Sequence, residues 1–323
     1  MKYRKLGRTG FEVSEMAYGL WGMSGWSGSD DAESLESLQL ATNLGCNFFD
    51  SAWAYGGGKS DSLLGQTIAR NTGKRLYAAS KIPPKNERWP ALPKYKYHDV
   101  FPPDHVFKYA DRIRNNLGTD CIDVLQFHVW TDEWTEEPDF RGTVEKLKRD
   151  GVVKSFGLSL NRWEPENGIK AIRTGLIDAV QVIYSIFDQS PEDELFPLCE
   201  ELNIGVIVRV ALDEGSLSGQ MTRDTKFPRD DWRSGYFNPK NLANTMQRVD
   251  QLKAILPPGM SLPEMALRFV NSHPTVSTTI VGMRKAAHVR ENLGLSDKGP
   301  LSPELLQELK KHRWDRRPAP WSD

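Results

Sequence analysis

The chain has 323 residues, of which 39% are hydrophobic and 26% are charged, and its formal net charge is −1. This balance excludes binding to nucleic acid or to an anionic membrane through bulk charge. A mean hydropathy of −0.53 and the lack of any apolar run near ~18 residues exclude a membrane span, and no apolar leader follows Met1. Three widely separated cysteines exclude a disulfide framework and a thiolate zinc site, so we expect a cytoplasmic protein.

Short apolar segments alternate with helical patterns along nearly the whole chain. Residues 2–6 and 11–14 flank a Gly-Arg-Thr-Gly turn and predict an N-terminal β-hairpin. The strands that follow are expected at residues 16–20, 47–50, 76–81, 123–128, 153–159, 179–183, 205–209 and 276–281. Their short, nearly continuous apolar runs are typical of parallel strands buried on both faces.

Amphipathic helices are expected between these strands. Residues 104–117 place apolar side chains at helical spacing, with Asp104 as the expected N-cap and Gly118 as the stop. Eight strand–helix units, most of them about 30 residues long, predict a single (β/α)₈ barrel domain over residues 1–323. Residues 1–15 would form the hairpin, and residues 296–323 a C-terminal helix and tail. An open dinucleotide-binding sheet is excluded because Gly19 is followed by Leu20-Trp21-Gly22, without the G-x-G-x-x-G pattern.

Two connections are longer than the others, at residues 82–103 after the third strand and 212–241 after the seventh. Both follow the carboxyl ends of strands, where barrel enzymes place their active sites. We expect them to form walls of the active site, although structural or oligomer-contact loops would have the same length.

Two common chemistries are excluded by pattern. Gly56-Gly57-Gly58-Lys59-Ser60 resembles a phosphate-binding loop, but Trp53 stands where that motif needs its first glycine. The six histidines include no H-x-H pair and no H-E-x-x-H motif, so we expect no catalytic metal.

Four ionisable residues come from three neighbouring strand ends. The second strand ends at Asp50 and is followed by Tyr55, the third ends at Lys81, and the fourth ends at His128. A tyrosine donates a proton at neutral pH only where its phenolate is stabilised, and Lys81, held by Asp50, can supply the charge. His128 can hydrogen-bond the oxygen that receives the proton. An acid beside a carbonyl oxygen, with neither nucleophile nor metal, is typical of hydride transfer from a nicotinamide.

These residues stand in segments that resemble the aldo-keto reductase family, from the hairpin to about residue 295. The family's D-[ST]-A-x-x-Y-G segment is similar to residues 50–56, and its lysine and histidine strands to residues 79–81 and 123–128. The resemblance implies a barrel that reduces an aldehyde or ketone with NADPH, NADH being the alternative cofactor. Tyr55 would be the general acid, Lys81 and Asp50 would tune it, and His128 would orient the carbonyl.

The resemblance also implies a set of cofactor contacts. They are Gly19, Leu20, Trp21, Asp50, Ser159, Gln181, Arg209, Leu212, Gly282, Arg284, His288, Glu291 and Asn292. Ser159 and Gln181 would bind the nicotinamide carboxamide, and Arg209 stands where an aromatic side chain commonly stacks on the ring. Because Gly282 replaces a lysine of many members, Arg284 would bind the 2′-phosphate, unless it only caps a helix.

The substrate is expected to be a small carbonyl compound in an aromatic-lined pocket. The residues expected to line it are Trp21, Trp26, Trp89, Trp130, Trp232 and Tyr236. Two alternatives stay open: an NADP(H)-binding regulatory subunit of this fold, as in some potassium channels, and alcohol or sugar oxidation as the physiological direction. The sequence identifies neither protein partners nor the oligomeric state.

Overall fold

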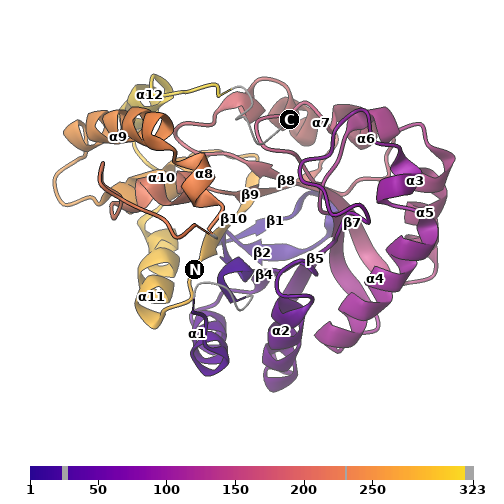
Figure 1. Cartoon of the computed structure of the whole chain (residues 1–323). Helices are drawn as coiled ribbons and strands as arrows, with labels where there is room; N and C mark the ends of the chain where they lie inside the picture. Colours follow the sequence, from indigo (N-terminus) through magenta and orange to yellow (C-terminus); the bar gives the residue numbers. More distant parts are fainter. Residues whose placement is uncertain (24–27, 230, 317–323) are drawn as a thin grey trace.

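A computed structural model of the chain, which describes residues 1–23, 28–229 and 231–316, shows eight parallel strands closed into a barrel (Figure 1). The strands are β3 (Met16–Gly19), β4 (Phe48–Asp50), β5 (Tyr77–Ile82), β6 (Ile122–Phe127), β7 (Val153–Ser159), β8 (Ala179–Ile183), β9 (Gly205–Arg209) and β10 (Val276–Gly282). Each pairs with the next along the chain, and β10 pairs with both β9 and β3. The predicted barrel is confirmed, and the predicted strand ends differ from the observed ones by at most one residue.

Helices surround this barrel on the outside (Figure 1). They are α1 (Asp31–Asn43), α2 (Lys59–Arg70), α3 (Tyr97–Val100), α4 (Pro103–Leu117), α5 (Pro138–Arg149), α6 (Ile169–Arg173), α7 (Leu195–Glu201), α8 (Arg233–Tyr236), α9 (Pro239–Ala254), α10 (Leu262–Ser272), α11 (Ala286–Gly294) and α12 (Pro303–Lys310). None of the described helices is both long and apolar enough to cross a membrane.

Helix α4 illustrates why these segments are helical. Its apolar residues Val106, Ala110, Ile113 and Leu117 form one buried stripe against the barrel. Gly118 ends the helix with φ of 65°, a left-handed conformation that glycine adopts without strain. The prediction that Asp104 caps the helix was wrong, because the helix begins one residue earlier with a proline at its first position and Asp104 lies in the first turn.

The N-terminal hairpin closes the end of the barrel where the strands begin. Strands β1 (Tyr3–Lys5) and β2 (Glu12–Ser14) pair antiparallel, as predicted. Leu6, Phe11 and Val13 are buried in a cluster with interior barrel side chains such as Phe48. There is no room for a side chain at Gly205, the first residue of β9, because a Cβ there would lie 2.6 Å from Leu6 Cδ1. The hairpin therefore acts as a plug that packs directly on the strands.

Both long connections are present, and each contains short helical segments. The one after β5 includes α3, and the one after β9 includes the 3-10 segment η5 (Asp213–Ser218) and helix α8. In η5, Asp213, Glu214 and Gly215 have φ of 46°, 55° and 101°. These left-handed residues interrupt η5 with a kink.

Candidate active site

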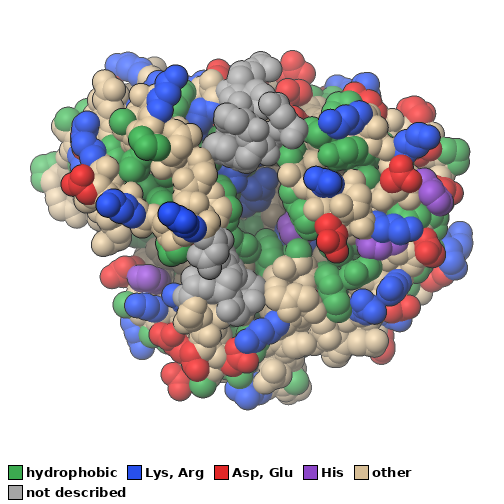
Figure 2. Space-filling model, in the orientation of Figure 1, with side chains coloured by type: hydrophobic (Ala, Val, Ile, Leu, Met, Phe, Trp, Pro, Cys, Tyr) green, Lys and Arg blue, Asp and Glu red, His purple; other side chains and the backbone are tan. Residues whose placement is uncertain are grey.

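A cleft opens where the barrel strands end, visible as a hollow with basic and histidine side chains inside (Figure 2). Its volume is about 630 Å³, and its wall includes the last residues of β3, β4, β9 and β10, which are Gly19, Asp50, Arg209 and Gly282. A narrower space of about 270 Å³ shares residues such as Tyr55, His128, Gln181 and Arg209 and extends to Ser159. The larger volume is typical of a small-molecule site.

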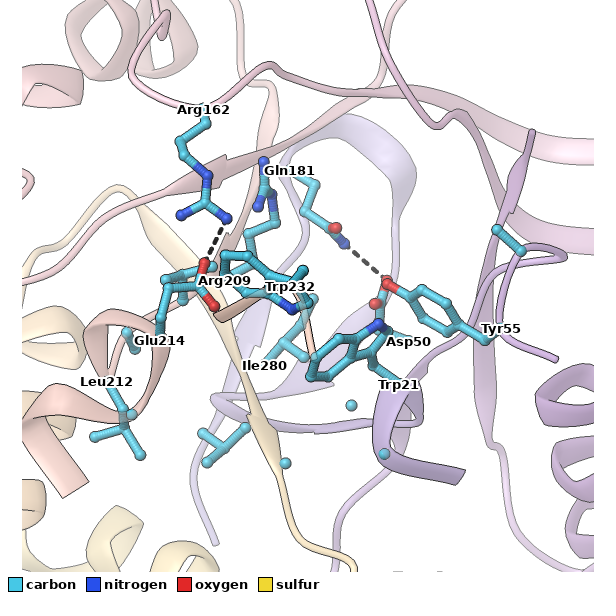
Figure 3. Close-up of a pocket in the computed structure, with 18 of the residues that line it drawn as sticks. Trp21, Asp50, Tyr55, Arg162, Gln181, Arg209, Leu212, Glu214, Trp232 and Ile280 are labelled. Atoms are coloured by element: carbon cyan, nitrogen blue, oxygen red, sulfur yellow. Dashed lines mark hydrogen bonds and ion pairs between the residues drawn. The ribbon is translucent and has the colours of Figure 1, made fainter. Parts of the chain in front are cut away.

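A buried ion pair forms the floor beneath this cleft. Lys81 Nζ donates to both carboxylate oxygens of Asp50 at 2.7 Å and to the Ser51 carbonyl at 2.8 Å. Lys81 has no exposed surface, and burial lowers its pKa, while the Asp50 carboxylate opposes that shift. Gln181 Nε2 donates to Asp50 Oδ1 at 2.7 Å, so the carboxylate is held from two strands (Figure 3).

Tyr55 and His128 stand above this pair, with ring centroids 5.8 Å apart. Burial and the Asp50 carboxylate raise the pKa of Tyr55, while Arg209 acts in the opposite direction. Lys81 Nζ lies 5.3 Å from the Tyr55 ring centroid, but its hydrogen bonds go to Asp50 and Ser51. Burial, with the charges of Lys81 and Arg209, holds the pKa of His128 well below its usual range, so this imidazole is neutral at neutral pH.

Sequence reasoning missed an ion pair across the cleft. Arg162, just after β7, and Glu214 in η5 lie 2.6 Å apart, and both line the cleft (Figure 3). The Arg162 guanidinium also lies 5.2 Å from the Trp232 ring centroid. The only signal in the sequence was the position of both residues after strand ends, since their pairing depends on the kink in η5.

The wall of the cleft fits a nicotinamide cofactor. Gln181 uses its Nε2 on Asp50, and its Oε1 makes no hydrogen bond to any described residue, so this oxygen can accept from a carboxamide. Ser159 lines the narrower space with its hydroxyl likewise unbonded within the described chain. Gly215 and Gly282 border the wider part, and a Cβ at either would meet open space, so a ligand can approach the backbone there.

Three of the predicted aromatic residues line the cleft: Trp21, Trp89 and Trp232. Two predictions were wrong. Trp130 is fully buried, with its ring centroid 4.7 Å from that of Phe140, because it packs inward beneath α5. Tyr236 is buried behind Trp232, 5.7 Å away between ring centroids. Trp26 lies outside the described residues.

The predicted cofactor residues divide into two groups. Those that line the cleft are Gly19, Trp21, Asp50, Ser159, Gln181, Arg209, Leu212 and Gly282. Leu20 does not line it, because its side chain is fully buried and its N–H donates to the Asp50 carbonyl. The structure does not bring the residues after β10 into the cleft. These are Arg284, His288, Glu291 and Asn292, which lie at or near α11 and are half-buried or exposed.

Comparison with known proteins identifies the family. The model of the aldo/keto reductase family matches residues 15–313. The chain belongs to this family. This aldo/keto reductase is therefore an oxidoreductase, and its barrel is the fold of the family.

Several relatives match over nearly the full length of both chains. An uncharacterised oxidoreductase of Bacillus subtilis is 28% identical, covering 97% of this chain and 96% of its own. A probable voltage-gated potassium channel subunit beta of Oryza sativa is 28% identical, with 96% and 95% covered. An NADH-specific methylglyoxal reductase of Escherichia coli is 25% identical, with 96% and 100% covered. The solved glycerol dehydrogenase of Gluconobacter oxydans superposes with a TM-score of 0.79 at 24% identity, covering 99% and 98%, and shares the fold.

Proposed function

We propose that this aldo/keto reductase reduces an aldehyde or ketone to an alcohol, with NADPH as the cofactor, in the cytoplasm. The observation that carries the proposal is the position of Tyr55 and His128 at the cleft, directly above the buried Lys81–Asp50 pair. Three free cysteines agree with a reducing compartment. The aromatic wall formed by Trp89 and Trp232 suits a small apolar carbonyl compound.

In the proposed mechanism, Tyr55 protonates the carbonyl oxygen as the general acid. His128, neutral because of its low pKa, hydrogen-bonds the same oxygen and orients the carbonyl. The ammonium of Lys81, fixed by Asp50, and the guanidinium of Arg209 stabilise the Tyr55 phenolate that remains after proton transfer. The bound cofactor supplies the hydride.

Gln181 and Ser159 would hold the nicotinamide carboxamide, and Arg209 would lie against the ring. The backbone near Gly215 and Gly282 would face the phosphates. Outside the cleft, where the cofactor would extend past Gly282 toward α11, Arg284 would bind the 2′-phosphate through bidentate guanidinium contacts, and Glu291 and Asn292 would contact the adenine. NADH is the alternative cofactor, as the name of the Escherichia coli relative illustrates.

Replacing Tyr55 by Phe tests the proposal, since it removes the proton donor and preserves the ring. Carbonyl reduction should fall at least 100-fold, because general acid catalysis contributes typically 10²–10⁴-fold. Affinity for NADPH, measured by quenching of tryptophan fluorescence, should stay nearly unchanged. Turnover equal to that of the wild type would contradict the assignment of Tyr55.

A regulatory subunit is the second candidate, because a potassium channel subunit is among the relatives. Its signature would be tight cofactor binding with negligible turnover across a panel of aldehydes and ketones. The Lys81–Asp50 pair beneath Tyr55 argues for turnover, because a buried ion pair is expensive to maintain where no chemistry needs it. The same panel, run with alcohols and oxidised cofactor, compares the two directions.

A further inference from the structure

Arg209 is the unbalanced charge of the cleft. Four charged side chains line it, and three of them are in ion pairs: Asp50 with the buried Lys81, and Arg162 with Glu214 at 2.6 Å. Arg209 forms no ion pair with any residue that the structure describes. Its side chain lines the narrower part of the cleft together with Arg162 and Gln181, and Figure 3 draws all three around the same space.

The surroundings of Arg209 supply little compensation for its charge. Its Nη2 donates to the Leu160 carbonyl at 2.9 Å, and its Nε is buried without a hydrogen-bond partner among the described residues. Desolvation and the nearby Arg162 lower the pKa of Arg209 to about 10, although Glu214 and Asp50 act in the opposite direction, so the side chain remains a cation at neutral pH. A desolvated cation without a directly paired carboxylate is costly, and its field is weakly screened inside the cleft.

That field covers the place where hydride transfer would occur. Arg209 borders both parts of the cleft together with Tyr55, His128 and Gln181. A nicotinamide that reaches a carbonyl held by Tyr55 and His128 must have its ring about 3–3.5 Å from that carbonyl. It would therefore lie in the space that Arg209 borders.

The two forms of the nicotinamide differ in charge. The reduced ring is neutral, and the oxidised ring has lost a hydride, with its electron pair, to the carbonyl carbon and carries one positive charge. We infer that Arg209 makes this site bind the reduced nicotinamide more tightly than the oxidised one. This inference rests on the proposed cofactor role of the cleft. It also implies that the oxidised cofactor is a stronger hydride acceptor when bound than when free. On the protein, the equilibrium between bound alcohol and bound carbonyl compound is therefore shifted toward alcohol oxidation.

The test compares the equilibrium affinities of the purified protein for NADPH and for NADP⁺ at fixed ionic strength. Binding is followed by the quenching of tryptophan fluorescence, since Trp21, Trp89 and Trp232 line the cleft. The wild type should bind NADPH at least tenfold more tightly, a difference of ~1.4 kcal/mol. Arg209→Met should reduce that ratio at least fivefold, whereas Arg209→Lys, which keeps the charge, should retain most of it. Arg141→Gln removes an exposed guanidinium on α5 and should leave the ratio unchanged.

The decision rests on the change caused at position 209, because the wild-type ratio alone reflects the summed field of all the charges near the cleft. A ratio that is the same in Arg209→Met and wild type, or near one in the wild type, would overturn the inference and leave the proposed reductase intact. If neither form binds the wild type, the proposed function itself fails. If circular dichroism shows that Arg209→Met does not fold, the ratio of the two affinities in Arg209→Gln is compared with the wild-type ratio instead.

Discussion

Asp61 lies beneath the cleft, in the first turn of α2, with no exposed surface. Ser80 donates to its Oδ1 at 2.8 Å, and its Oδ2 has no hydrogen-bond partner among the described residues. Burial raises its pKa to about 6, opposed by the nearby hydroxyls of Ser51 and Ser80 and by the charge of Lys81, while Asp50 adds to the shift. The ionised form of Asp61 is therefore disfavoured in the folded protein relative to the unfolded chain, where its pKa is ~3.9.

The sign of this shift predicts a pH-dependent stabilisation by Asp61→Asn. Stability due to the protonated carboxyl is present below pH ~4 and is lost as the pH rises through about 6. At pH 8 the Asn variant, which cannot ionise, should therefore be more stable than the wild type. The gain should reach about 3 kcal/mol, because the pKa of Asp61 differs by roughly two between the folded and unfolded chain. At pH 5 the gain should be about half as large, because the carboxyl is already ionised in the unfolded chain and still mostly protonated in the folded protein.

Urea denaturation of the wild type and Asp61→Asn at pH 5 and pH 8 measures both free energies of unfolding. Asp224→Asn changes an exposed carboxylate and serves as the control, with no difference expected between the two pH values. A gain of equal size at both pH values, or a loss at pH 8, would show that Asp61 is not disfavoured by ionisation.

At the scale of elements, Arg316 connects the C-terminal segment to η5. It forms ion pairs with Asp188, which follows β8, and with Asp213, which begins η5, and its Nη1 donates to the Tyr236 hydroxyl at 2.6 Å. All four residues are buried. Ser216 Oγ donates to Asp213 Oδ2 at 2.6 Å, so the tail and η5 share one polar network.

Arg316→Met should lower the free energy of unfolding by about 3–5 kcal/mol, because it leaves two buried carboxylates without their cation. Cofactor should also bind more weakly, since Leu212, Glu214 and Gly215 on either side of Asp213 line the cleft. Chemical denaturation and fluorescence titration measure the two effects. The control is Arg313→Met, whose partners Asp193 and Asp315 are largely exposed, so that a loss below ~1 kcal/mol is expected. Losses of similar size in both variants would contradict the role given to Arg316.

The same elements show what the sequence can and cannot predict. Strand ends were predicted within one residue because buried parallel strands have continuous apolar runs, and the position of Asp50 or Arg209 follows from strand order alone. The Arg162–Glu214 pair depends on left-handed conformations in η5 that no residue pattern specifies. Trp130 was misplaced because a large aromatic after a strand end fits equally well in a cleft wall and in the core, where the structure buries it.

At the scale of the whole molecule, stability and chemistry are assigned to opposite ends of the barrel. The hairpin plugs the end where the strands begin, and the cleft occupies the end where they finish. Leu6 is fully buried in the plug, packed with Val13 and the interior residues Ala17 and Phe48. A defect in the plug should therefore lower stability without altering the cleft.

Leu6→Ala tests this separation. Deleting the buried side chain leaves a cavity against β9 and should cost about 2–5 kcal/mol of unfolding free energy, measured in urea. Affinity for the cofactor should stay within twofold of wild type at temperatures where the variant is folded. Leu44→Ala, at a leucine that is 39% exposed after α1, should change stability by less than ~0.5 kcal/mol. A loss of cofactor affinity as large, in free energy, as the loss of stability in Leu6→Ala would contradict this separation. The plug and the cleft would then be coupled through the strands, because a barrel core that is close-packed along its length can transmit strain from one end to the other.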